Sequence, residues 1–243
     1  MSALAVIGAL AIGLALGMTG AGGSILTFPV LVHLAGVSPA NAVAMSLFIV
    51  GAAALVGAVQ RAAMGHLHLR AAGWFTLSGM LGAVAGSRFT HMIPESALVL
   101  LFAAVMIVVG IRMWLGKSGV ADPAPECKPV RCFLAGAGVG LVTGFLGVGG
   151  GFLLLPALTR FARLPVSVAT GTSLAIIAIN AFGGFLGHVR HANIDWLVVL
   201  TFSAIAVVAV LLGGRLAKRM NPLLLRRVFA VIVLLTAAGM LIF

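Results

Sequence analysis

The sequence predicts an all-α, polytopic integral membrane protein made of two inverted repeats. Each repeat is expected to contain one re-entrant, glycine-broken helical hairpin and three transmembrane helices. Three observations predict this: an apolar composition, eight apolar stretches and a glycine pattern that occurs twice. Of 243 residues, 62% are hydrophobic and only 8% are charged. A soluble domain carries about 25% charged residues, so lipid is the solvent that fits this chain.

The formal net charge of +11 could suggest a nucleic-acid partner. The basic residues, however, stand singly between long apolar runs, which is how loop charges orient a membrane protein. A protein that binds DNA would gather them on one soluble face. The predicted partners are therefore the lipid bilayer and a small anion, with a homodimer as a candidate assembly. Nucleic acid, cofactors and metals are not predicted.

The apolar stretches cover approximately residues 3–36, 38–60, 67–87, 95–114, 132–162, 165–188, 195–214 and 223–243. Most are long enough to cross a hydrocarbon core of roughly 30 Å as one helix. The first and fifth are too long, since residues 3–36 would run about 50 Å as a straight helix. Both are interrupted by glycines, namely Gly20, Gly22 and Gly23 in the first and Gly147, Gly149, Gly150 and Gly151 in the fifth.

The chain divides into a first repeat at 1–115, a polar linker at 116–130 and a second repeat at 131–243. A shift of 127 residues superimposes the pattern GxxGxGGxxLxxP of residues 17–29 on that of residues 144–156. The same shift places Ser46 on Ser173 and Arg88 on Arg215. A fixed-period match of this kind indicates an internal repeat.

Two topologies compete. If all eight stretches cross the membrane, the loop charges divide eight against seven. If the first and fifth stretches turn back at their glycines, thirteen basic residues collect on one side and only Arg88 and Arg190 on the other. The positive-inside rule favours the second topology. It makes the linker cytoplasmic, places both termini outside and inverts the second repeat relative to the first, as in many secondary transporters.

The two turning points could meet near the middle of the membrane. A short helix is expected to begin near Ser24 in one repeat and near Phe152 in the other, or later, because proline prefers the first helical position and Pro29 and Pro156 follow. Helix N-termini carry unpaired N–H groups and the positive end of the helix dipole, so two of them would favour an anion. The alternative is that the glycines only permit close helix packing.

Polar residues in the stretches are candidates to line the path, although Ser and Thr often bond to their own helix. The predicted substrate-binding set is Gly20, Gly22, Gly23, Ser24, Ser46, Gly147, Gly149, Gly150, Gly151, Thr172, Ser173 and Asn180, with Thr19 as a further lining residue. Arg88 and Arg215 are candidates for gating or substrate recruitment, or are interfacial arginines that snorkel. The histidines at 66, 68, 188 and 191 are interpreted as interfacial rather than metal-binding.

The acidic residues also bear on the substrate. The chain has four, namely Glu95, Asp122, Glu126 and Asp195, and all lie near predicted loops. Carriers of cations usually need an intramembrane counter-charge. The distribution therefore favours an anionic or neutral substrate.

Several motifs resemble those of the sulfite exporter TauE/SafE family of bacterial membrane transporters. They are GMTGAGGSILTFP at 17–29, GFLGVGGGFLLLP at 144–156, ATGTSL at 169–174, NIDW at 193–196 and GGR at 213–215. The resemblance covers nearly the whole chain. It implies a multi-pass carrier of the bacterial plasma membrane that exports sulfite or organosulfur anions such as sulfoacetate, sulfonates or thiosulfate. Thr19 departs from the second copy, which has Leu146.

The leading function is therefore secondary transport of a small anion by alternating access. The alternatives are an anion channel, an intramembrane enzyme and an assembly scaffold. An enzyme would need a catalytic set such as Ser with His, paired aspartates or HExxH. The sequence has no HExxH motif and no aspartate pair in the apolar stretches, so no enzyme activity is predicted.

Overall fold

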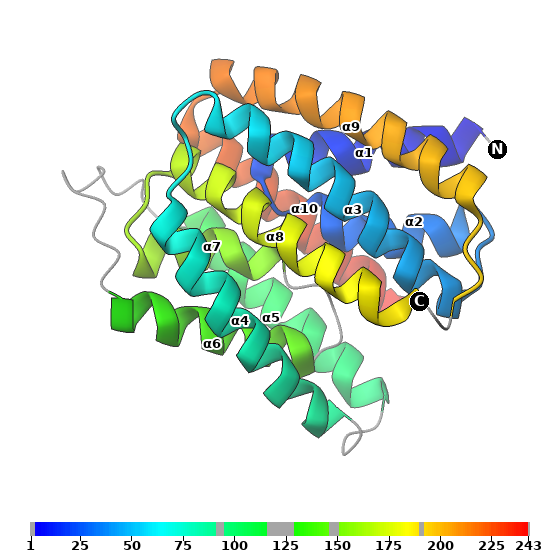
Figure 1. The fold of residues 1–243 in the computed structure, drawn as a ribbon, viewed down its shortest axis with the longest axis horizontal. Helices are drawn as coiled ribbons and strands as arrows, with labels where there is room; N and C mark the ends of the chain where they lie inside the picture. Colours follow the sequence, from blue (N-terminus) through cyan, green and yellow to red (C-terminus); the bar gives the residue numbers. More distant parts are fainter. Residues whose placement is uncertain (1–2, 91–94, 116–128, 146–150, 190–191, 243) are drawn as a thin grey trace.

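The computed structural model describes residues 3–90, 95–115, 129–145, 151–189 and 192–242. Within these ranges the chain forms ten α-helices (Figure 1). They are α1 (Ala3–Thr19), α2 (Gly23–His33), α3 (Pro39–Ala62), α4 (Leu69–Thr90), α5 (Glu95–Leu115), α6 (Pro129–Phe145), α7 (Gly151–Phe161), α8 (Val166–His188), α9 (Trp196–Arg219) and α10 (Pro222–Ile242).

The helix boundaries follow the predicted stretches, and the two over-long stretches are each divided in two. The first gives α1 and α2, and the fifth gives α6 and α7. Helices α2 and α7 begin at Gly23 and Gly151, one residue before the predicted starts. Pro29 and Pro156 lie inside these helices, so the alternative of a start at the prolines is wrong. In the first stretch the turn at the glycines already ends the preceding helix, so the proline is not needed for the break.

Two helix pairs, α1 with α9 and α4 with α6, pack closely through glycines. A Cβ atom added at Gly13 would collide with the Ala206 carbonyl oxygen, and one at Gly140 would collide with the Gly79 carbonyl oxygen. Backbones approach this closely only where the residue between them has no side chain. We call these contacts the α1–α9 seam and the α4–α6 seam.

Helices α3 and α8 lie side by side through the middle of the molecule (Figure 1). A Cβ at Gly57 of α3 would lie 3.1 Å from Leu174 of α8. A third contact joins α5 to α10, where a Cβ at Gly110 would lie 2.7 Å from Leu234. Fully buried aromatic side chains, among them Phe75, Phe202 and Phe229, fill the spaces between these helices.

The outer surface is that of a membrane protein. Large apolar side chains are exposed on many helices, for example Leu77 and Leu81 on α4 and Leu197 on α9. Among the described residues, three helices are both long and apolar enough to cross a bilayer, over Asn41–Ala62, Val166–His188 and Trp196–Arg219. The number of crossings in each repeat stays a prediction.

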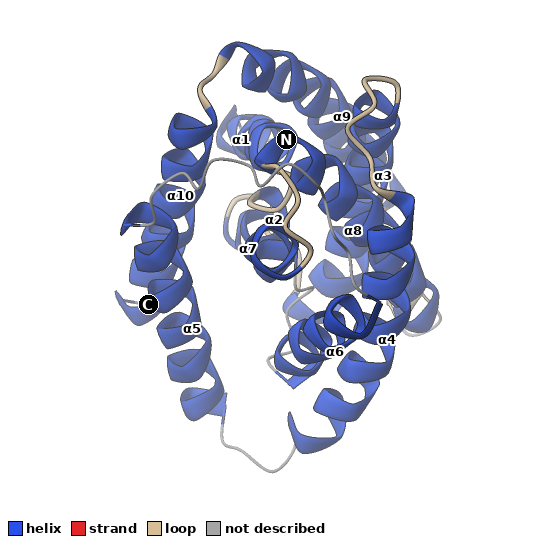
Figure 2. Ribbon diagram, turned by 90° about the vertical axis from the view of Figure 1, so that its left-hand side faces the viewer, coloured by secondary structure: helices blue, strands red, loops and turns tan. Residues whose placement is uncertain are grey.

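The two short helices that follow the breaks are enclosed by the long ones. Figure 2 shows α2 and α7 inside a ring formed by the other helices. Helix α2 contacts α1, α3 and α7, and α7 contacts α6 and α8. Both short helices therefore lie in the interior of the molecule.

Candidate functional site

The break between α1 and α2 is built by Thr19 and Gly20. Gly20 has a φ of +75°, a conformation that favours glycine. The Thr19 hydroxyl donates to the Ala15 carbonyl oxygen at 2.6 Å and accepts from the backbone N–H of Gly22 at 2.9 Å. One buried side chain thus satisfies a carbonyl near the end of α1 and an amide at the start of α2. Thr19 serves the break itself, a role that sequence reasoning missed.

Helix α2 runs back along α1. A Cβ at Gly23, the first residue of α2, would lie 2.7 Å from the Leu16 side chain near the end of α1. A Cβ at Gly8, near the start of α1, would lie 2.6 Å from Val30 near the end of α2. The first over-long stretch therefore forms a hairpin, as its length and glycines predicted.

The N-terminal ends of α2 and α7 meet. A Cβ at Gly151, the first residue of α7, would lie 2.6 Å from the Ser24 Oγ atom and 2.9 Å from Ile177 of α8. Ser24 Oγ itself donates to the Ala21 carbonyl oxygen at 2.8 Å. Gly147, Gly149 and Gly150 lie outside the described residues. Of the glycines predicted in the second break, Gly151 is the one described, and it lies against Ser24 at the start of α2.

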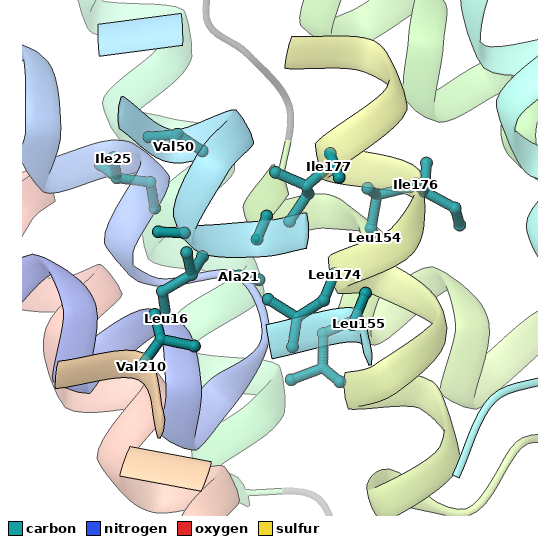
Figure 3. Close-up of a cluster of buried hydrophobic side chains, with 14 of the residues drawn as sticks. Leu16, Ala21, Ile25, Val50, Leu154, Leu155, Leu174, Ile176, Ile177 and Val210 are labelled. Carbon is teal, nitrogen blue, oxygen red and sulfur yellow. The ribbon is translucent and has the colours of Figure 1, made fainter. Parts of the chain in front are cut away.

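The surroundings of the first break are apolar. Figure 3 shows that Leu16, Ala21 and Ile25 belong to one buried hydrophobic cluster with Leu174 and Ile177 of α8 and with Leu154 and Leu155 of α7. Ala21, Leu16 and Leu174 are fully buried. Polar backbone at the break therefore lies in the hydrophobic core, where an unpaired polar group is costly.

Helix α8 supplies the polar residues that touch this break. The Ser173 hydroxyl lies 3.0 Å from the Gly20 carbonyl oxygen and 2.9 Å from that of Thr170, and it donates to them. The Thr172 hydroxyl donates to Val168 O at 2.8 Å and accepts from the His68 backbone N–H at 3.1 Å. Ser173 thus reaches the break directly, whereas Thr172 joins α8 to the segment before α4.

The remaining polar candidates differ in their bonding. Ser46 donates to the Val43 carbonyl oxygen of its own helix at 2.8 Å. The Asn180 Oδ1 atom is buried and has no hydrogen-bond partner within the described residues. Arg215 is exposed near the end of α9, and the Arg88 side chain lies outside the described residues. The group of Asn180 that stays unused in the described part of the chain is thus a hydrogen-bond acceptor.

Arg61 is a residue whose place sequence reasoning missed. It was counted as a loop charge, but it lies in the last turn of α3 and is only 3% exposed. Its Nη2 atom donates to the Gly17 carbonyl oxygen at 3.1 Å, and its Nε atom is buried with no hydrogen-bond partner among the residues that the structure describes. The signal in the sequence was that Arg61 directly follows the uninterrupted apolar stretch at 38–60. A helix that continues past this stretch includes Arg61 and can pack it against neighbouring helices.

The histidines mostly complete helix ends. His68 Nδ1 accepts from the Ala71 N–H at the start of α4, and His188 Nδ1 lies 2.9 Å from the Gly184 carbonyl oxygen. His66 Nδ1 is buried without a partner in the described part of the chain, and His191 lies outside that part. The described residues contain no group of three His, Cys, Asp or Glu side chains that could hold a metal.

Comparison with known proteins finds a family and several relatives that match most of the chain. The family model described as "Sulfite exporter TauE/SafE" matches residues 4–240. A probable membrane transporter protein of Xylella fastidiosa (strain 9a5c) is 36% identical over 235 residues, covering 93% of this chain and 89% of the relative. A probable membrane transporter protein of Bacillus subtilis (strain 168), YunE, is 22% identical over 229 residues, covering 84% and 82%.

Proposed function

The chain belongs to the sulfite exporter TauE/SafE family of multi-pass membrane transporters, and on this premise we propose that it exports a small anion across the bacterial plasma membrane by alternating access. The substrate class we propose is sulfite or an organosulfur anion such as sulfoacetate, a sulfonate or thiosulfate. The protein is a transporter and not an enzyme.

The observation that carries this proposal is the meeting of two helix N-termini inside the molecule, at Ser24 of α2 and Gly151 of α7. The first residues of a helix carry N–H groups that have no partner within the helix, together with the positive end of its dipole. Two such ends directed at one point attract negative charge. The glycines there let an anion approach the backbone closely.

The pairing of the seams supports an inverted repeat. Gly13 of the first half contacts Ala206 of the second. A shift of 127 residues converts this pair into Gly140 and Gly79, which are also in contact. Each seam therefore pairs one helix from each half through equivalent positions. Two halves that contact each other through equivalent positions are expected in a transporter whose repeats move against each other around a central site.

Charge supports the orientation. We propose that the linker at 116–130 and the basic helix ends face the cytoplasm, that both termini face outside and that the protein forms a homodimer. The exposed Arg215 and the equivalent Arg88 would then act at opposite membrane faces in gating or recruitment.

The proposed binding set keeps the glycines of both breaks together with Ser24, Ser46, Thr172, Ser173 and Asn180. The hydroxyl hydrogens of Ser46, Thr172 and Ser173 are each donated to a backbone carbonyl. An anion needs hydrogen-bond donors, so these hydroxyls would have to rotate to contact it. Backbone amides at the helix ends are therefore the main proposed contacts, and Asn180 would contribute through its side-chain NH2 group, since its Oδ1 atom is an acceptor.

Efflux of sulfite from loaded proteoliposomes tests the proposal. Gly151→Leu should abolish efflux, because the new side chain would fill the space between Ser24 and Ile177. Gly187→Leu is the matched control, since a Cβ there meets no described residue within 4 Å and Gly187 is exposed on α8. Efflux that survives Gly151→Leu in a folded protein would disprove the site. Conductance far above carrier rates would instead indicate a channel.

A further inference from the structure

Arg61 is a buried permanent charge. A guanidinium stays protonated at every physiological pH. Burial of an ion without a counter-charge is very costly, so buried charges in proteins are paired. The side chain is only 3% exposed, and its Nε atom donates to nothing in the described residues. Its hydrogen bond to the Gly17 carbonyl oxygen, a neutral acceptor at the end of α1, leaves the charge uncompensated.

The chain offers few carboxylates that could pair with it. Of the four acidic residues, Asp195 is exposed and accepts hydrogen bonds from the N–H groups of Leu197 and Val198 at the start of α9. Glu95 is the first residue of α5, and Asp122 and Glu126 belong to the linker at 116–130. Asp195 is the one carboxylate whose side chain the structure describes, and it forms no ion pair with Arg61. A bound anion would supply the charge that Arg61 lacks in this part of the chain.

Arg61 contacts the end of α1, directly before the first break. Its acceptor, Gly17, lies in the last turn of α1, three residues before Gly20 of the break. On α8, a Cβ at Gly171 would lie 2.9 Å from the Arg61 Cβ, while the neighbouring Thr170 and Ser173 contact Gly20. The same short segment of α8 therefore touches both the charge and the turn that presents the N-terminus of α2.

The second half has no equivalent charge. The position 127 residues after Arg61 is His188, which is exposed and lies beside the Gly184 carbonyl oxygen of its own helix. The arginine of the first half is thus not repeated at the equivalent position of the second half.

We propose that Arg61 supplies the counter-charge for the transported anion and sets its preference for divalent over monovalent anions. This inference rests on the proposed function, since it assumes an anion at the two helix ends. With the site empty, the guanidinium stabilises the carbonyl end of α1, which carries the negative end of the helix dipole. With an anion bound, the buried charge strengthens binding in proportion to the charge of the anion, because little water screens it.

Transport kinetics of thiosulfate and methanesulfonate in proteoliposomes test this assignment. One anion is divalent and the other monovalent. Arg61→Gln should raise KM by about 100-fold for thiosulfate and about tenfold for methanesulfonate, because the Coulomb term doubles with ligand charge. Arg70→Gln, which removes an exposed arginine of α4, should change neither value. Equal losses for both anions, or a loss confined to the maximal rate, would show a purely structural role and overturn the assignment.

A titratable variant keeps the test valid if Arg61→Gln does not fold. In Arg61→His, the thiosulfate preference should be present at about pH 5.5 and lost at about pH 8, on either side of the ordinary histidine pKa of roughly 6.5. Wild type should keep its preference at both values. A preference in Arg61→His that ignores pH contradicts the assignment.

Two further outcomes separate the possible causes of failure. If wild type carries neither anion, the proposed function fails and the role of Arg61 fails with it. If the divalent preference follows phosphatidylglycerol content in the vesicles rather than the residue at position 61, a lipid phosphate is the counter-charge and the assignment to substrate is wrong.

Discussion

Glycine serves opposite purposes in the seams and at the first break. In the α1–α9 and α4–α6 seams the glycines are helical, and they bring backbones together where any side chain would collide. At the break, Gly20 leaves the helical conformation and reverses the chain. Close packing and a break in the helix are therefore both present, in different places, and the function of the break stays a proposal.

The first break and the seams also differ in the polar side chains that surround them. At the break, Thr19 and Ser173 bond to backbone atoms of the turn, and the charged Arg61 lies behind it. The seams are closed by carbonyls, small side chains and aliphatic carbon. This contrast implies that seam variants should lower folding stability, whereas break variants should lower transport more than stability.

The largest effect is expected from Gly140→Ile in the α4–α6 seam. The new side chain would collide with the Gly79 backbone, which cannot move without separating the two helices. Overpacking of this kind costs about 3 kcal/mol or more. Thermal unfolding of the detergent-solubilised protein, followed by size-exclusion chromatography, should show little folded material.

Gly138→Ile is the control for that prediction. Gly138 lies on the same helix, is exposed and has no atom of the described residues within 4 Å of a new Cβ. A Gly140→Ile protein as stable as Gly138→Ile would show that the seam tolerates separation.

An intermediate effect is expected from Gly20→Ala. A Cβ there would lie 2.7 Å from Thr170, and an L residue at a φ of +75° costs about 1–2 kcal/mol. Gly65 has a similar conformation, with a φ of +72°, but its new Cβ would meet no part of the described chain within 4 Å. Sulfite efflux should fall much further in Gly20→Ala than in Gly65→Ala. Similar efflux in the two variants would mean that the geometry of the break is not needed for transport.

The smallest effect is expected from Ser173→Ala. It removes the bond to the Gly20 carbonyl oxygen, and a hydrogen bond of this kind contributes about 1 kcal/mol. Ser46→Ala removes only a bond within its own helix. The difference between the two unfolding midpoints therefore measures the contact between α8 and the break. No difference would show that this contact adds nothing to stability.

Much of the fold could be predicted from the sequence. Helix lengths and breaks follow from local properties, namely the run of apolar residues, the glycines and the bilayer thickness that a helix must match. The starts of α2 and α7 were therefore predicted to within one residue. The candidate site was harder, because contacts such as Ser24 with Gly151 join segments that are distant along the chain.

The sequence by itself determined that this protein belongs in a membrane, that its first and fifth apolar stretches are interrupted and that its glycine pattern occurs twice. These are properties of composition and spacing, which need no partner. Only the tertiary structure decided that Thr19 completes both ends of the first break and that Arg61 lies buried behind it. Burial and hydrogen bonding depend on which helices pack together, and the order of residues along one helix does not contain that information.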